Sequence, residues 1–174
     1  MVMSMLDAGG IPPLTDSFRT ADDDNPHGYY EFEPVKRLRQ ADYSWLPQAQ
    51  GKAVKIISAL VTYLPPDYNY QVLFMQRAIP EILASQRKML IHRGEDPHKF
   101  SDSEMELTFE KHLTHVRSWL AGQANISTQL VDYNQMVENP APLAAEINRF
   151  LGGYLDEQDM IAVVDPHLYR QRAG

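Results

Sequence analysis

The sequence predicts an α/β domain in which a short parallel sheet is flanked by helices. Three apolar segments have the length of buried strands, and helical patterns separate them along the chain. These strand candidates are residues 51–60, 72–75 and 127–133. Strands that alternate with helices indicate parallel pairing and a layered α/β domain.

Length and composition fit a single domain that spans residues 1–174. The chain is 44% hydrophobic and 22% charged, and its formal net charge of -7 argues against a general nucleic-acid binder. The absence of cysteine excludes disulfides, thiolate metal ligands and cysteine nucleophiles. We find neither a signal-peptide pattern nor an apolar run long enough to span a membrane, and therefore expect a cytoplasmic protein.

The first third of the chain is expected to combine two helices, a long loop and one strand. Residues 1–8 have the pattern of a helix that ends at Gly9-Gly10. Residues 11–28 are rich in proline and aspartate, which is typical of a loop. Residues 35–43 have the pattern of an amphipathic helix, and residues 51–60 that of a strand.

The segment after the second strand candidate has the features of an anion site. Arg77 lies where the strand at residues 72–75 should end, and Pro80 suits the first turn of a helix over residues 78–93. Open α/β sheets bind ligands at the carboxyl ends of their strands, and a helix start attracts negative charge. An arginine in such a place can equally be a surface group engaged in an ordinary salt bridge.

The second half of the chain predicts two further helix–strand transitions. A long helix begins near Ser101 or Ser103, either of which could cap it, and ends at Gly122. His112 lies on or beside the apolar face of this helix, where a structural role is favoured over a catalytic one. Residues 134–140 follow the strand at residues 127–133 and lead into a helix that runs through Ala144 to Leu151, and residues 155–164 hold a last short helix.

A carboxylate among aromatic residues is the first candidate for acid–base chemistry. Glu31 follows Tyr29 and Tyr30, and aromatic surroundings raise the pKa of a carboxyl group by desolvation. Glu33 lies in the same segment, and the glutamates could instead face water.

Several of these segments together resemble the sulfotransferase family, whose members use 3'-phosphoadenosine 5'-phosphosulfate (PAPS). An arginine at a strand end with a serine eight residues later is similar to the family's 3'-phosphate-binding segment. The Asn-Pro-His-Gly-Tyr-Tyr-Glu string resembles a segment of bacterial members, and Val-Lys-Ile-Ile resembles the family's second parallel strand. Val-Asp-Tyr-Asn-Gln-Met-Val-Glu-Asn-Pro, followed by Phe-Leu-Gly, is similar to the family's late strand, loop and helix.

The resemblance implies a three-layer, P-loop-like fold and a set of functional residues. Arg77 and Ser85 would bind the 3'-phosphate of PAPS or of adenosine 3',5'-bisphosphate, and the late arginines Arg170 and Arg172 would close over the phosphates. Glu31 would remove the proton of the acceptor hydroxyl, or amine, and Lys55 would face the acceptor. Members of the family use either a glutamate or a histidine as this base, so Glu33 and His27 are alternatives. The acceptor would be a small molecule, a glycan or a lipid, and no metal is required.

One family element does not occur in this sequence. The first strand and its 5'-phosphosulfate loop, roughly Pro-Arg-Ser-Gly-Thr-Ser, are absent, and residues 3–10 resemble the second half of the helix that follows that loop. We therefore expect a truncated or reduced relative with an open sheet edge that a second copy could cover. A non-catalytic protein that binds a nucleotide or a partner is the alternative. A P-loop kinase or GTPase is disfavoured, because the lysine loop is absent.

Overall fold

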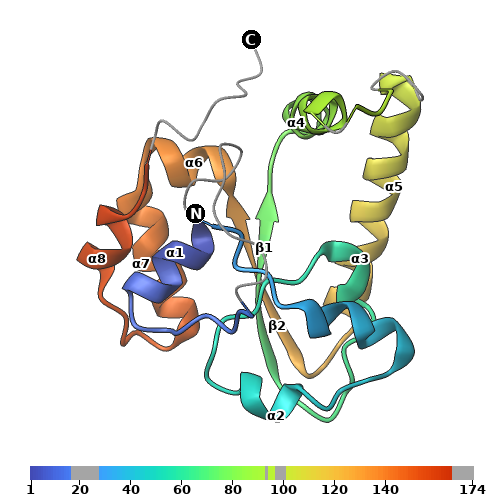
Figure 1. Ribbon diagram of the computed structural model, residues 1–174. Helices are drawn as coiled ribbons and strands as arrows, with labels where there is room; N and C mark the ends of the chain where they lie inside the picture. The colour runs from blue at the N-terminus through green and yellow to red at the C-terminus, as the bar shows by residue number, and fades with distance from the viewer. Residues whose placement is uncertain (17–27, 93, 97–100, 166–174) are drawn as a thin grey trace.

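The computed structural model describes residues 1–16, 28–92, 94–96 and 101–165, and it confirms the mixed α/β class (Figure 1). In chain order its elements are α1 (Val2–Ala8), the 3₁₀ helix η1 (Glu33–Gln40), α2 (Leu46–Ala49), α3 (Ser58–Val61), β1 (Tyr70–Gln76), α4 (Ile79–His92), α5 (Asp102–Ala121), β2 (Ile126–Asp132), α6 (Tyr133–Glu138), α7 (Pro140–Leu151) and α8 (Glu157–Ala162). None of the helices within the described ranges is long and apolar enough to cross a membrane.

The sheet that these residues form consists of β1 and β2, which pair in parallel as expected. The register joins Tyr70 to Ile126 at one end and Gln76 to Asp132 at the other, so both strands end at the same level. The residues that follow each strand therefore emerge at one edge of the sheet.

Helices cover both faces of the strand pair. Alternate residues of a strand point to opposite sides, and in this sheet both sides carry apolar side chains. Met75 and Val131 pack into a core cluster with residues of α1, α6, α7 and α8. Phe74, on the other face, packs with Val116 and other apolar residues of α3 and α5. Figure 1 shows α1, α7 and α8 on one side of the strands and α3 and α5 on the other.

The expected strand at residues 51–60 is wrong in most of its length. Ala53 alone in this segment makes a β-bridge, to Pro13 and in parallel, and the chain turns into α3 at Ser58. In this turn Leu60 and Val61 are both buried, in two different core clusters. A short apolar run cannot by itself distinguish a strand from a buried helical turn.

The helices after β1 follow the expected signals. Ser101 caps α5 in a capping box with Glu104, and Gly122 ends that helix as expected. The helix expected after Asn139 is α7, which runs from Pro140 to Leu151, and the segment before it forms the short helix α6. Gly152 then ends α7 in the left-handed region, with φ of 118°.

The N-terminal helix α1 packs against α8 at very short range. A Cβ atom on Gly9 would lie 2.7 Å from the Cγ atom of Met160, which no real side chain would tolerate. Gly9 ends α1 as expected, but its φ of -75° is open to any residue. Close approach of the two helices, and not backbone freedom, is therefore the reason for glycine at this position.

Candidate functional site

The carboxyl edge of the two strands gathers the polar residues that follow them. Because Gln76 and Asp132 are paired, Arg77 and Tyr133 leave the sheet side by side. The guanidinium carbon of Arg77 lies 4.8 Å from the centre of the Tyr133 ring, a cation–π contact. The predicted position of Arg77, between a strand end and the start of α4, is therefore confirmed.

Arg77 is held by a carboxylate that the sequence analysis did not single out. Its Nε atom donates to Oε2 of Glu81 at 2.8 Å, and the two side chains are 21% and 2% exposed. Such burial makes this pair unlike a surface salt bridge, because both groups have given up most of their hydration. Glu81 lies in the first turn of α4, where a negative charge also suits the helix dipole.

The second strand supplies the other partner of Glu81. Asp132 caps α6 by accepting from the backbone N–H groups of Asn134 and Gln135, which fixes Asn134 at the sheet edge. The Nδ2 atom of Asn134 donates to Oε1 of Glu81 at 3.2 Å. Its Oδ1 atom is buried and has no hydrogen-bond partner among the described residues. Glu81 thus links the ends of both strands.

Burial and the charges at the strand edge change the pKa of the neighbouring phenol, that of Tyr133. Burial raises the pKa of Tyr133 above its usual value, with the charge of Arg77 opposing this shift and that of Glu81 adding to it. Tyr133 therefore remains a neutral phenol around pH 7, and its ring can serve as an uncharged surface for the guanidinium.

Ser85, the second residue of the predicted phosphate pair, lies on α4, the helix that also carries Glu81. It is half-buried on α4, one turn beyond Glu81, and residues four apart lie on one helix face. Arg77 contacts Glu81 and Tyr133. Glu81 thus lies between the two residues of the predicted pair along the chain.

The predicted catalytic residues Glu31 and Lys55 come from two segments that contact each other. The Nζ atom of Lys55 donates to the backbone oxygen of Tyr29 at 2.9 Å. The backbone oxygen of Glu31 accepts from Oγ1 of Thr15 at 3.0 Å. The Met1 amino group has a lowered pKa, first because of burial and then because of the charge of Lys55, which places that lysine near the start of α1.

The remaining residues predicted from the sequence are placed as follows. Glu33, the alternative base, forms an ion pair with Lys36 on the exposed side of η1. His27, Arg170 and Arg172 lie outside the described residues. His112 accepts or donates a 2.8 Å hydrogen bond with Ser58, which ties α5 to α3 and confirms that this histidine is structurally engaged.

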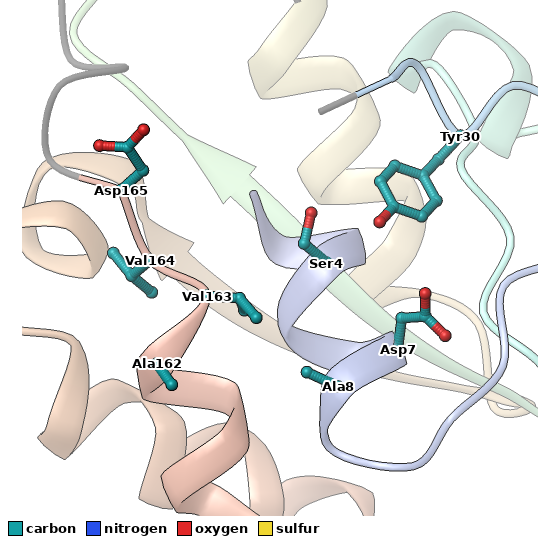
Figure 2. Close-up of a pocket in the computed structure, with 8 residues that line it drawn as sticks. All are labelled: Ser4, Asp7, Ala8, Tyr30, Ala162, Val163, Val164 and Asp165. Carbon is teal, nitrogen blue, oxygen red and sulfur yellow. The ribbon is translucent and has the colours of Figure 1, made fainter. Parts of the chain in front are cut away.

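A pocket adjoins the tyrosine that precedes Glu31. It has a volume of about 590 Å³ and is lined by Ser4, Asp7, Ala8, Tyr30, Ala162, Val163, Val164 and Asp165. Figure 2 shows the ring of Tyr30 extending toward α1, where Ser4 and Asp7 lie. Tyr30 has a φ of 50°, a left-handed conformation that is uncommon for a residue other than glycine and often accompanies a functional constraint.

The two parts of the candidate site share one region of the core. Tyr30, Met75 and Tyr133 pack against the same apolar cluster, so the pocket and the strand edge belong to one side of the molecule. Arg77 contacts Tyr133 at the edge, whereas the pocket lining contains neither Arg77 nor Glu31.

Sequence reasoning missed Glu81, Tyr133 and Asn134. The four-residue spacing between Arg77 and Glu81 was a usable signal, because it is the spacing of ion pairs on a helix. Nothing in the sequence indicates that Tyr133 and Asn134 would meet that pair, since this depends on the register of the strands.

The described ranges contain no group of three or more histidine or acidic residues that could hold a metal ion. Comparisons of the chain with family models, with characterised proteins and with solved structures found no match.

Proposed function

We propose that this chain is a nucleotide-binding domain of sulfotransferase type, with the three-layer, P-loop-like fold that the resemblance implies. Its ligand would be PAPS or adenosine 3',5'-bisphosphate, bound at the carboxyl edge of β1 and β2. The observation that carries the proposal is the position of Arg77, at the end of a parallel strand and beside the start of a fourteen-residue helix. A guanidinium and a helix start are both suited to a phosphate dianion.

The proposed reaction moves a sulfuryl group from PAPS to an acceptor hydroxyl or amine. The acceptor oxygen or nitrogen forms the new bond to sulfur, the bond from sulfur to the phosphate oxygen breaks, and adenosine 3',5'-bisphosphate leaves. Glu31 would take the acceptor proton, and Lys55 would lie beside the acceptor. The pocket is lined by Tyr30, the residue before Glu31 in the chain, and it would admit part of a small molecule, glycan or lipid.

The Arg77–Glu81 pair favours a second candidate, a relative that binds a nucleotide without transferring sulfate. The carboxylate reduces the positive charge that Arg77 can offer to a phosphate. Such a protein would bind adenosine 3',5'-bisphosphate weakly and would release no sulfated product from PAPS.

Thermal unfolding with nucleotides tests the proposal. A ligand present at one hundred times its Kd stabilises the native state by about 2.7 kcal/mol, so adenosine 3',5'-bisphosphate should raise Tm by several degrees. Adenosine 5'-phosphate, which lacks the 3'-phosphate, should raise it less. The R77M variant should lose the difference between the two ligands, while R39M, which removes an exposed arginine of η1, should retain it.

Two results would contradict the proposal. An unchanged Tm at millimolar adenosine 3',5'-bisphosphate would show that the chain has no nucleotide site. An equal response to the two nucleotides would place the 3'-phosphate away from Arg77. Incubation with radiolabelled PAPS and mixed hydroxylated acceptors then separates a transferase from a binding protein.

A further inference from the structure

We infer that Glu81 is a positioning residue, which fixes the orientation in which the guanidinium of Arg77 meets the 3'-phosphate. The inference rests on the proposed function and adds to it a residue whose role is to orient the phosphate-binding group without touching the ligand.

The guanidinium is planar, so two contacts are enough to define its orientation. The Tyr133 ring at 4.8 Å limits the plane, and the hydrogen bond from Nε to Glu81 at 2.8 Å fixes the rotation within that plane. Because Nε donates to Glu81, we assign the phosphate to the two terminal nitrogens of Arg77. Those nitrogens form the fork that binds two oxygens of one phosphate.

Glu81 can act as a positioning residue because it is itself immobilised. Its side chain is 2% exposed, and its other oxygen accepts from Asn134 at 3.2 Å. Asn134 is held in turn by the N-terminal turn of α6, which Asp132 caps. The orientation of Arg77 is therefore set from β1 and α4 on one side and from β2 and α6 on the other.

Glu81 also brings a negative charge close to the proposed phosphate. This charge would weaken phosphate binding, whereas the positioning of Arg77 would strengthen it. Substitution by glutamine separates the two effects, because its amide oxygen still accepts from Nε of Arg77 while the charge is removed. The amide nitrogen of Gln needs an acceptor, and the buried Oδ1 of Asn134 can supply it after rotation of that amide. Substitution by methionine keeps the buried volume but removes both the acceptor and the charge.

Calorimetric titration with adenosine 3',5'-bisphosphate and adenosine 5'-phosphate tests the inference through the ratio of the two Kd values. We expect E81Q to discriminate between the nucleotides at least as well as the wild type. E81M should discriminate about tenfold less well than E81Q, the size expected for losing a hydrogen bond that involves a charged group. E138Q, which removes an exposed carboxylate of α6, is the matched control and should behave as the wild type.

Equal discrimination by E81Q and E81M would overturn the inference. If both variants gained affinity, Glu81 would act only by repulsion, and if neither changed, it would have no part in phosphate binding. A role confined to folding would lower Tm in E81M without altering the ratio of Kd values.

The NMR signal of the Arg77 Nε–H proton provides a readout that needs no nucleotide. It should exchange slowly in the wild type and in E81Q and rapidly in E81M, with its assignment taken from its loss in R77M. Slow exchange with no nucleotide binding would reject the proposed function but support the positioning of Arg77 by Glu81. Fast exchange in the wild type would reject the inference, whatever the binding result.

Discussion

Removal of Arg77 alone should destabilise the protein more than removal of the whole charge pair. In R77M the methionine still covers Tyr133, but Glu81, with only 2% of its side chain exposed, loses the cation 2.8 Å away. Breaking a buried ion pair from one side costs about 3 kcal/mol, because a desolvated charge remains. In R77M/E81Q the remaining group is neutral and can still bond to Asn134, so we expect about 2 kcal/mol of this loss to be recovered.

Urea unfolding of the wild type, R77M, E81Q and R77M/E81Q gives the coupling energy as a double-mutant cycle. A loss below about 0.5 kcal/mol in R77M, the range of ordinary surface substitutions, would refute the reasoning. So would a double variant that is no more stable than R77M, because Glu81 would then not be the group that needs the cation.

Two further predictions concern the scaffold of the site. G9A should lower the stability of the protein by about 1–3 kcal/mol, the usual cost of overpacking, because its Cβ would lie 2.7 Å from Met160. In G122A the nearest neighbour lies at 3.4 Å, so this control variant should be almost neutral. Thermal unfolding of both variants checks the prediction. Burial, and then the charges of Tyr68, Asp67 and Tyr43, raise the pKa of Tyr70 to about 12 from 10.0. The unfolded chain therefore loses this proton first, so the contribution of Tyr70 to stability is complete below about pH 10 and is lost as pH rises toward about 12. Spectrophotometric titration of the phenols should show a late step that Y70F lacks, and Y70F should be less sensitive to alkaline unfolding. A Tyr70 that titrates together with the exposed tyrosines would contradict this assignment.

Local signals accounted for the parts of the fold that were predicted well. The capping box at Ser101 and the left-handed stop at Gly152 depend only on residues next to each other in the chain, and the structure has both. The strand at residues 72–75 was recognisable from a continuous apolar run bounded by polar residues. Because parallel strands require a helical crossover, their pairing followed from the alternation of the two patterns.

The features that the sequence did not predict depend on contacts between segments that are distant in the chain. Residues 51–60 have the composition of a strand, but Ala53 alone in this segment makes a β-bridge, and the chain turns into α3 at Ser58. Arg77 alone was enough to predict a ligand site at the carboxyl edge of the sheet. That Tyr133 and Asn134 lie beside Arg77 depends on the register of two strands that are distant in the chain. The roles of Glu31 and Lys55 stay predictions, since the structure shows where they lie and not which ligand they meet.

The parallel pairing of β1 with β2 also bears on how the molecule folds. Between Gln76 and Ile126 the chain must pass through α4 and α5 before the second strand can reach the first. Pairings with such a large sequence separation raise the contact order, because loop-closure entropy must be lost before the hydrogen bonds form. Arg77 and Tyr133 meet only when this pairing is complete. The proposed ligand edge should therefore be among the last parts of the protein to assemble, after its helices have collapsed.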